Sequence, residues 1–533
     1  MWDYIIVGAG SAGCVLANKL TENGKYKVLL LEAGGSDRNP LLRIPFAGSI
    51  LTVGNAKYDW NYETLPDPSR HDRTGIWPRG KLLGGSSSIN GMIYVRGHQD
   101  DYNHWAQLGN KGWSYEDVLP YFKNLESNER DDPAYYGKDG PLKVRPVKGA
   151  HPLSHQFVEA CVEQGLPHNP DYNAAHQEAA CLLHVNQSPR MRYSSAQAFL
   201  QPARKRANLD IETGAQASRI IFEGKRATGI EYIQKGEKKT AHAAREVILS
   251  GGSINSPQLL MLSGVGPAAH LKDKNIEVIA DLAGVGQNLQ EHACIPMRAE
   301  VNMKTFNMEQ NAWSALKYGA QWAFQGKGPL TTVIFQALAF AKTNEKLSYP
   351  DIQIHFGPIG YEAADNEVKL LDCPAITMQP NVNRSRSRGE LTLKSNNPLD
   401  HPLIQPNMLG DEYDVKTLIE GGKFCRKLYQ SEALKPYFVK ELLPDPAVKS
   451  DEDWEDFVRE YSGPVFHPVG TCKMGVDAMS VVDPELKVQG FEGLRVIDGS
   501  VMPQVISGNT NAACLMIGAK GAHMILADAA KTP

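Results

Sequence analysis

The sequence DYIIVGAGSAG, residues 3–13, decides the fold of this chain. Its apolar run Tyr4–Val7 predicts a buried strand, and the glycines after it predict a tight turn into a helix. In this pattern Gly8 permits the turn, and Gly10 lets the backbone approach a pyrophosphate. Gly13 allows the helix to pack closely on the strand.

A second strand and a carboxylate complete the pattern. The helix is predicted to run to about Leu20, and the next apolar strand, Lys27–Leu31, ends at Glu32. A carboxylate at this point can accept hydrogen bonds from a ribose, and the helix N-terminus can bind a phosphate. A chance glycine turn is the alternative. We interpret this βαβ unit as a dinucleotide site, with either FAD or NAD open, that includes Ser11, Ala12 and Ala33.

The bulk composition is that of a globular protein with more than one core. The chain has 533 residues, 42% of them hydrophobic, and a formal net charge of −4. This length predicts two large domains, and the charge balance argues against a nucleic-acid partner. The eight cysteines are scattered without a CxxC pair, and no HExxH occurs, so we expect no metal site and a reducing, cytoplasmic location.

Membrane insertion is not expected from the sequence. The N-terminus enters a strand at once, without the basic and apolar regions of a signal peptide. The longest apolar stretch, 512–530, is interrupted by Lys520, His523 and Asp528, so we predict a buried helix there rather than a transmembrane segment.

Two later apolar strands resemble the first two. Val247–Leu249 and Leu494–Ile497 also end at glycine or an acidic residue. We therefore predict one nucleotide-binding sheet, of α/β, Rossmann-like type, assembled from discontinuous segments. The predicted division assigns 1–150, 200–295 and 468–533 to this domain, and 151–199 and 296–467 to a substrate-binding domain.

Five further blocks carry a family resemblance. They are PRGKLLGGSSSING (78–91), GSINSPQLLMLSGVG (252–266), VGQNLQEH (285–292), HPVGTCKMG (467–475) and GNTNA (508–512). Together they resemble the glucose–methanol–choline (GMC) oxidoreductase family, most closely its bacterial alkanol, L-sorbose and choline dehydrogenases. The resemblance implies the GMC fold, with an α+β substrate-binding domain that contains an antiparallel sheet, and the FAD-dependent oxidation of an alcohol.

The same resemblance implies a cofactor site. Some relatives carry a histidine bonded covalently to FAD, and Ile89 stands at the matching position here, so we expect FAD to bind non-covalently. Small residues in this block suit close backbone contact with a flat ring or a phosphate, although a flexible linker is the alternative. The other predicted cofactor residues are Trp60, Arg79, Gly80, Gly84, Gly85, Ser86, Asn90, Gly91, Met92, Ile93, Ala217, Gly252, Asp498, Gly499, Asn511 and Ala512.

Two residues are predicted to carry the chemistry. Hydride transfer from an alcohol carbon requires a base for the hydroxyl proton, and histidine suits this task near neutral pH. By resemblance His467 is the base, although a histidine beside proline is often only structural. Asn511 is predicted to lie opposite the base and to orient the substrate oxygen, although helix capping is its alternative role.

The predicted substrate pocket includes Phe335, Gln336 and Phe466. Choline-oxidising relatives have a glutamate where Gln336 stands, and an amide offers no net charge to a cation. We therefore expect a neutral primary alcohol or polyol, and a quinone or other non-oxygen electron acceptor, with peripheral membrane contact left open. The alternatives are an oxidase that forms H2O2, a choline dehydrogenase, an FAD-containing hydroxynitrile lyase and a non-catalytic flavin protein.

Overall fold

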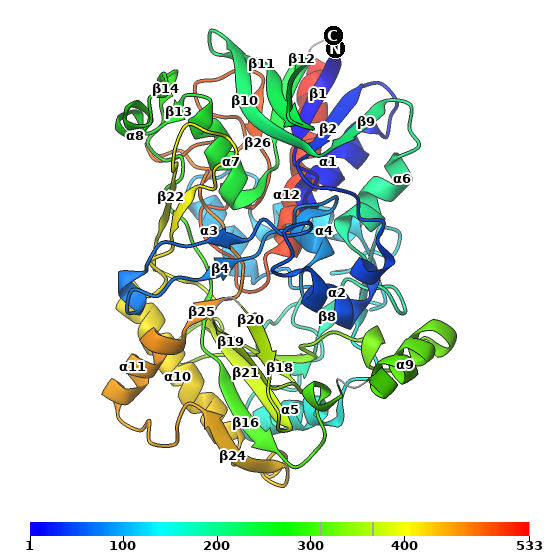
Figure 1. The fold of residues 1–533 in the computed structure, drawn as a ribbon, viewed down its shortest axis with the longest axis vertical. Helices are drawn as coiled ribbons and strands as arrows, with labels where there is room; N and C mark the ends of the chain where they lie inside the picture. Colours follow the sequence, from blue (N-terminus) through cyan, green and yellow to red (C-terminus); the bar gives the residue numbers. More distant parts are fainter. Residues whose placement is uncertain (310–311, 365–366, 532–533) are drawn as a thin grey trace.

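The computed structural model describes residues 1–309, 312–364 and 367–531 (Figure 1). Its first large sheet has seven strands, and the central ones are parallel. The order is β10 (Ala215–Glu223), β11 (Arg226–Gln234), β12 (Glu237–Leu249), β1 (Trp2–Val7), β2 (Val28–Glu32) and β9 (Leu209–Thr213), and β26 (Leu494–Val496) pairs with β12.

This sheet confirms the prediction that distant strands share one layer. β1 pairs in parallel with both β2 and β12, and β12 pairs in parallel with β26. All five residues of β2 are buried, which explains its continuous apolar run. The carboxyl ends of these strands lie at one edge, where helices α1 (Ser11–Thr21) and α7 (Gly252–Leu262) begin.

The C-terminal helix lies within the core. α12 (Asn511–Lys531) packs on α1 and on α4 (Tyr115–Leu125), and its small residues permit the close approach. Gly518, for example, has no side chain where a Cβ would lie 2.8 Å from the carbonyl oxygen of Ala12. Of the described helices, α12 alone has the length and composition to cross a membrane, and 56% of its most apolar window is buried inside the protein. A helix buried in a protein core can have the same length and composition.

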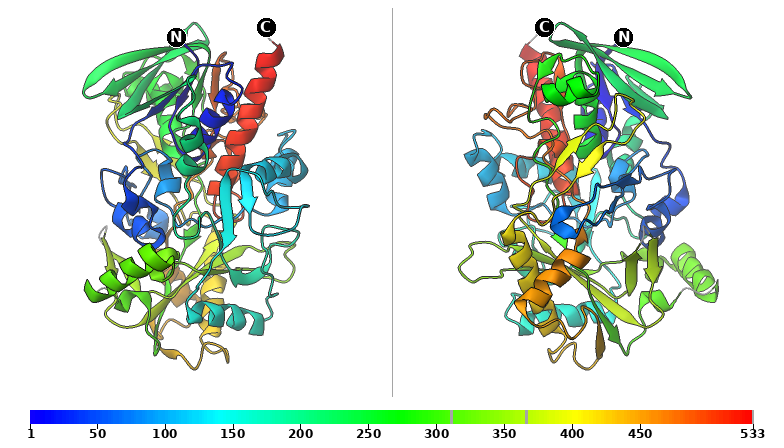
Figure 2. Two further views of the ribbon diagram at one scale, coloured as in Figure 1. Left: turned by 90° about the vertical axis from the view of Figure 1, so that its right-hand side faces the viewer. Right: turned by 60° about the vertical axis from the view of Figure 1, so that its left-hand side comes forward.

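The second large sheet is antiparallel, as predicted. It has the order β24 (Phe438–Leu443), β16 (Met297–Val301), β21 (Ala375–Val382), β18 (Ile352–Gly357), β17 (Ala337–Ala341) and β7 (Ala179–Leu182). β15 (Ala293–Cys294) pairs with β21, and β25 (Gly463–Pro464) pairs with β15. Helices α5 (Pro152–Glu163) and α10 (Glu412–Leu428) pack on it. The two sheets lie toward opposite ends of the molecule (Figures 1 and 2). The predicted boundaries at 295 and 467 fall beside β15 and β25, which pair with each other.

The remaining elements are short and connect or cover the two sheets. The other helices are α2 (Pro45–Thr52), α3 (Gln99–Gln107), α6 (Gln201–Ala203), α8 (Ala268–Asp273), α9 (Ala312–Ala320) and α11 (Asp451–Tyr461), and the short 3-10 or π turns are η1 (Pro40–Arg43), η2 (Pro68–Arg70), η3 (Gly85–Ser88), η4 (Ala196–Leu200), η5 (Phe306–Met308), η6 (Gln321–Gln325), η7 (Pro329–Thr331) and η8 (Gly499–Val501). The other strands are β3 (Tyr62–Glu63), β4 (Ile76–Trp77), β5 (Glu126–Asn128), β6 (Leu142–Pro146), β8 (His184–Val185), β13 (Val265–Gly266), β14 (Ala280–Asp281), β19 (Tyr361–Ala364), β20 (Glu367–Leu370), β22 (Glu390–Thr392) and β23 (Leu403–Gln405).

Candidate active site

A large cavity runs from the parallel sheet to the antiparallel sheet. Its volume is about 2510 Å³. Pockets for single drug-sized ligands usually hold about 300–1,000 Å³, so this one has room for a dinucleotide together with a substrate. The first residues of three helices line it: Ser11 of α1, Gly252 of α7 and Asn511 of α12.

Most of the predicted cofactor residues line this cavity. They are Gly8, Gly10, Ser11, Ala12, Glu32, Ala33, Trp60, Arg79, Gly80, Gly85, Ser86, Asn90, Gly91, Met92, Ile93, Ala217, Gly252, Asp498, Gly499 and Asn511. Three others do not line it. Gly13 packs against Gly8, because a Cβ there would lie 1.9 Å from the Gly8 carbonyl oxygen. Gly84 packs against Ser88, and Ala512 is buried in α12.

The glycine turn has the close approaches that a dinucleotide site needs. Gly8 has a φ of +103°, and a Cβ there would lie 2.4 Å from the carbonyl oxygen of Ser250. Gly85 has a φ of +51°, and its Cβ would meet the Cα of Gly10 at 2.8 Å. Gly10, the N-cap residue of α1, has no side chain that could cap the first turn of the helix. The backbone N–H groups of that turn are therefore available for a phosphate. These residues therefore fit a bound pyrophosphate.

Two carboxylates hold the backbone around this wall. Glu32 Oε2 accepts a hydrogen bond from Ala9 N at 2.9 Å, and its Oε1 accepts one from Gly34 N at 2.8 Å. Burial raises the pKa of Glu32 to about 7. Asp498 accepts a hydrogen bond from Gly252 N at 2.9 Å, so it fixes the start of α7 as well as lining the cavity.

His467 lies at the far side of the cavity, in a chain of hydrogen bonds whose direction can be worked out. His292 Nε2 lies 3.0 Å from the carbonyl oxygen of Asn383, which can only accept, so this nitrogen carries a proton. Burial lowers the pKa of His292 to about 4, so the ring is neutral and its Nδ1 is an acceptor. His292 Nδ1 lies 3.0 Å from His467 Nδ1, which must therefore donate.

The other side of His467 gives the same answer independently. Asn509 Oδ1 accepts a hydrogen bond from Gln353 Nε2 at 3.2 Å, which turns its amide nitrogen toward His467. Asn509 Nδ2 lies 3.1 Å from His467 Nε2 and can only donate. Both neighbours therefore assign the proton of His467 to Nδ1 and leave Nε2 unprotonated, where it accepts the hydrogen bond from Asn509. This is the tautomer that a general base requires.

The partner of His467 is Asn509, and the predicted pairing with Asn511 is wrong. Asn511 is the first residue of α12, and its Oδ1 accepts a hydrogen bond from Ser11 Oγ at 2.7 Å on the cofactor side. Asn509 precedes the helix and extends toward the antiparallel sheet. Both side chains line the cavity, on different walls. The two asparagines are two positions apart, and the start of α12 at Asn511 places their side chains in different surroundings.

The surroundings of His467 keep it neutral. Burial first, then the neighbouring His292, His355 and Arg79, lower the pKa of His467 well below 6.5. The backbone N–H of His467 donates to Glu291 Oε1 at 2.7 Å, and Glu291 also accepts from the N–H of His292. A single buried carboxylate thus holds both histidine backbones. Neither His292 nor Asn509 was predicted as a site residue from the sequence.

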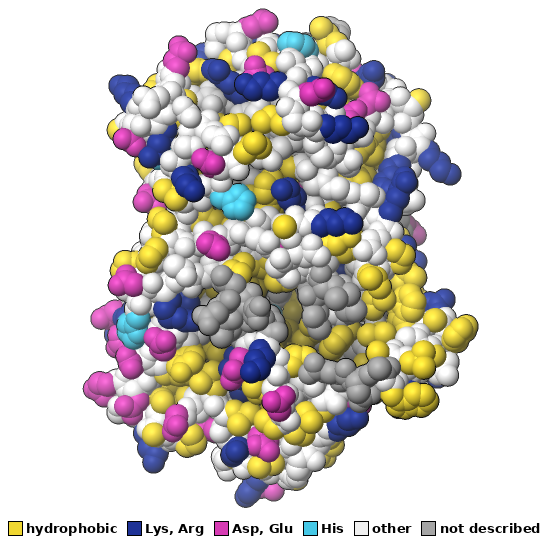
Figure 3. All heavy atoms as spheres, viewed as in Figure 1, with side chains coloured by type: hydrophobic (Ala, Val, Ile, Leu, Met, Phe, Trp, Pro, Cys, Tyr) yellow, Lys and Arg dark blue, Asp and Glu magenta, His cyan; other side chains and the backbone are white. Residues whose placement is uncertain are grey.

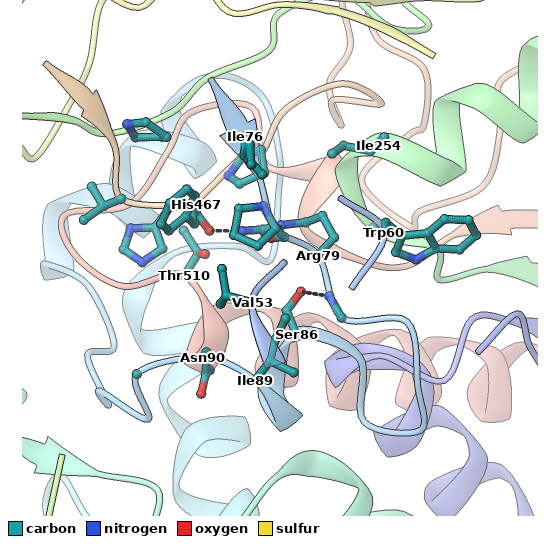
Figure 4. Close-up of a pocket in the computed structure, with 18 of the residues that line it drawn as sticks. Val53, Trp60, Ile76, Arg79, Ser86, Ile89, Asn90, Ile254, His467 and Thr510 are labelled. Carbon is teal, nitrogen blue, oxygen red and sulfur yellow. Dashed lines mark hydrogen bonds between the residues drawn. The ribbon is translucent and has the colours of Figure 1, made fainter. Parts of the chain in front are cut away.

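Arg79 and Phe466 shape the wall beside His467. Arg79 donates to the carbonyl oxygen of Phe466 at 2.6 Å, and Figure 4 shows the guanidinium next to His467. Phe466 has a φ of +67°, which is unfavourable for a residue with a bulky side chain. This conformation is therefore held by its neighbours. Trp60 stacks on Tyr62 at the edge of the cavity.

The predicted substrate residues separate in the structure. Phe335 and Phe466 line the cavity, but Gln336 does not. Gln336 is fully buried, and its Oε1 accepts hydrogen bonds from His151 N and Ser154 Oγ. Its Nε2 donates to Thr332 Oγ1. This side chain is therefore occupied in joining loops beneath the pocket, so placing it in the pocket was wrong.

Comparison with known proteins adds to this geometry. Two family profiles described as GMC oxidoreductase match residues 2–294 and 385–518. The chain is 43% identical to "Alcohol dehydrogenase [acceptor]" of Pseudomonas putida, over 99% of this chain and 96% of that one. It is 42% identical to "Oxygen-dependent choline dehydrogenase" of Brucella anthropi, over 98% and 95%.

A solved structure shares the fold along its whole length. It is a formate oxidase from Aspergillus oryzae RIB40 studied for the modification of its FAD, 25% identical, with a TM-score of 0.91 and 99% of each chain covered. The dinucleotide cradle, the histidine at its far side and the full-length matches agree. The chain belongs to the GMC oxidoreductase family of FAD-dependent enzymes.

Proposed function

We propose that this protein oxidises a neutral alcohol, either a primary alcohol or a polyol, with His467 as the general base and Asn509 as the group that orients the substrate oxygen. The single observation that carries the proposal is the hydrogen-bond chain through His292, His467 and Asn509. It leaves the lone pair of His467 Nε2 beside an amide donor at the cavity wall, which is the pair of groups that a hydroxyl needs.

The roles of these residues follow from their atoms. When bound, FAD supplies the ring that accepts the hydride from the alcohol carbon. His467 Nε2 takes the hydroxyl proton, and Asn509 Nδ2 donates to the oxygen as negative charge develops on it. The lowered pKa of His467 keeps the base unprotonated at neutral pH. His292 holds the ring in its productive tautomer through Nδ1.

The cavity wall near the base supports a neutral substrate. Val333, Phe335 and Ile359 line it with apolar groups. Glu291 lies close to His467, but its Oε1 is occupied by backbone N–H groups, and burial raises its pKa to about 7. A quaternary ammonium ion is stabilised by an ionised carboxylate, and burial disfavours the ionised form of Glu291, so these surroundings favour an uncharged alcohol over choline.

The cofactor and the acceptor complete the proposal. We propose non-covalent FAD, because Ile89 lines the cavity where a covalent attachment would require a nucleophilic side chain. The relative named "Alcohol dehydrogenase [acceptor]" supports a quinone or another non-oxygen acceptor. All eight cysteines are free, which supports a cytoplasmic location.

Anaerobic absorbance of the FAD-loaded protein tests the proposal. We expect straight-chain primary alcohols or polyols to bleach the flavin, and choline to do so weakly. In air, a quinone or dye should be reduced without matching H2O2, and acid denaturation should release all FAD into solution. A flavin that stays oxidised with every alcohol would favour a lyase on the same fold, and stoichiometric H2O2 would favour an oxidase.

A further inference from the structure

Helix α9 and the turn η6 expose an apolar stripe to solvent. Trp313 is 73% exposed, Leu316 67% and Phe324 88%, which places them among the most exposed large apolar side chains in the described part of the chain. Their spacing of three and then eight residues lies along one side of a helix. Isolated exposed apolar residues need no explanation, but a continuous row of them indicates a binding surface.

Further exposed apolar side chains flank α2, near residues that line the cavity. α2 packs on η1 and η7, and η7 packs on α9, so these elements form one surface, the α2–α9 surface. Leu41 and Val53 are also exposed on it, and Val53 and Pro45 line the cavity. Figures 1 and 2 show α2 beside α9 on one side of the molecule.

The charge of this surface differs from that of the whole chain. Residues 38–53 and 313–331 contain four basic side chains, Arg38, Arg43, Lys317 and Lys327, and no aspartate or glutamate. The nearby Glu309 contacts Tyr318 of α9, but Lys304 pairs with it at 2.9 Å. The whole chain has more acidic than basic residues, 60 against 56. In Figure 3 the hydrophobic side chains gather toward the right-hand side where α9 lies, and many acidic side chains lie along the opposite edge.

We propose that the α2–α9 surface docks the protein on an anionic phospholipid membrane. An amphipathic helix with Trp, Leu and Phe on one side and lysines beside them is suited to lie in the headgroup region of a bilayer. A second copy of the chain is a poorer partner, because a two-fold contact through this surface would bring the same basic side chains together. A bilayer instead offers acyl chains to the apolar stripe and negative headgroups to the lysines.

The role of this docking rests on the proposed alcohol oxidation, because docking would bring the cavity to its substrate or acceptor. Val53 and Pro45 place the mouth of the cavity next to the surface that would meet the bilayer. An apolar alcohol or a quinone could then reach the cavity from the lipid phase. The docking itself can be measured without any turnover, so its failure and the failure of the proposed chemistry are distinguishable.

Sedimentation of the FAD-loaded, full-length protein with lipid vesicles tests the proposal. One set of vesicles contains phosphatidylcholine alone, and the other also contains phosphatidylglycerol. We expect the protein to bind the anionic vesicles and to be released by salt. Replacing the stripe by Trp313→Ser, Leu316→Ser and Phe324→Ser should lower the partition coefficient at least about tenfold.

Two further variants make the test specific. A matched triple change elsewhere, Leu399→Ser, Val439→Ser and Val476→Ser, also removes exposed apolar side chains and should bind vesicles like the unmodified protein. The pair Lys317→Gln and Lys327→Gln should lose the preference for phosphatidylglycerol. Dye-linked alcohol oxidation without vesicles should be unchanged in the stripe variant, since none of its three residues lines the cavity.

Defined results would overturn the proposal. Absence of vesicle binding by the unmodified protein, or equal binding by the stripe and control variants, would remove the membrane role. If light scattering showed a dimer that the stripe variant alone converts to a monomer, the surface would belong to a second copy. A failure of dye-linked oxidation in the unmodified protein would bear on the proposed function alone.

Discussion

The two walls of the cavity are built from different material. The cofactor wall is formed by backbone, from glycines and helix N-termini. Its segments can approach one another closely because glycines such as Gly8 and Gly85 have no side chain. The opposite wall consists of side chains, and its function depends on particular nitrogen and oxygen atoms of His292, His467 and Asn509. Added side-chain bulk on the cofactor wall should therefore weaken FAD binding, and loss of single atoms on the opposite wall should lower the rate of flavin reduction.

The largest effect is expected at His467. His467→Ala removes the base and should lower the rate of flavin reduction by at least about 10²-fold. FAD should stay bound, because the dinucleotide cradle lies on the other wall. Anaerobic stopped-flow absorbance gives the rate, and the absorbance ratio of flavin to protein gives the occupancy. A variant that reduces its flavin at the original rate would show that another group is the base.

The two asparagines before and at the start of α12 provide the next test. Asn509→Leu keeps the size of the side chain but removes the donor that faces His467 Nε2, so we expect the reduction rate to fall by about 10–100-fold. Asn511→Leu removes the hydrogen bond to Ser11 and should mainly weaken FAD retention. Measuring both the flavin reduction rate and the FAD dissociation constant for each variant distinguishes the roles of the two walls. The reverse pattern would restore Asn511 as the partner of the base.

The cofactor wall is tested by adding single methyl groups. Gly85→Ala introduces a Cβ at 2.8 Å from the Cα of Gly10 in a left-handed conformation, so FAD should bind roughly tenfold more weakly. Gly319→Ala is the control, because Gly319 lies outside the cavity and its Cβ would meet nothing within 4 Å. Fluorescence titration of the apoprotein with FAD measures both affinities. Equal affinities would show that close backbone approach does not limit binding.

The smallest effect is expected at His292, where two conservative changes keep different halves of its role. His292→Asn keeps an acceptor near the position of Nδ1, and His292→Gln keeps a donor toward the carbonyl of Asn383. We expect the glutamine variant to lose several-fold to about tenfold in reduction rate and the asparagine variant to lose less. Equal losses would mean that His292 acts only by filling space.

The pH profile gives a second measurement on the same variants. Neutral His467 is the active form and its pKa lies well below 6.5, so the rate should be constant through neutral pH and fall only in acid. His292 is one of the groups that lower this pKa. Its replacement by glutamine should therefore move the acid limb toward higher pH.

The cofactor wall could be predicted from the sequence better than the other wall. Glycine spacing and apolar strands are local signals, and they correctly joined β1, β2, β12 and β26 into one sheet although β26 is far away in the chain. The hydrogen-bond chain has no local signal. His292, Gln353 and His467 come from distant segments, and only the packing of the antiparallel sheet against the start of α12 brings them together.

Asn511 and Gln336 show two different limits of prediction from the sequence. For Asn511, the asparagine that is hydrogen-bonded to His467 lies two positions earlier, because the sequence did not specify where the helix begins. For Gln336, the position in the chain was inferred from relatives, but its side chain points away from the cavity into a loop junction. Side-chain direction depends on neighbours that only the folded chain supplies.

The order of strands in the parallel sheet has a consequence for biosynthesis. β1 spans Trp2–Val7, whereas β26, which pairs with β12 in the same sheet, the carboxylate of Asp498, and the helix α12, which packs on α1, all come from the segment that starts at Leu494. During synthesis the cofactor wall can therefore close only after the segment from β26 to α12 has left the ribosome. A chain that lacks this segment leaves the face of α1 that packs on α12, and the edge of β12 that pairs with β26, without their partners.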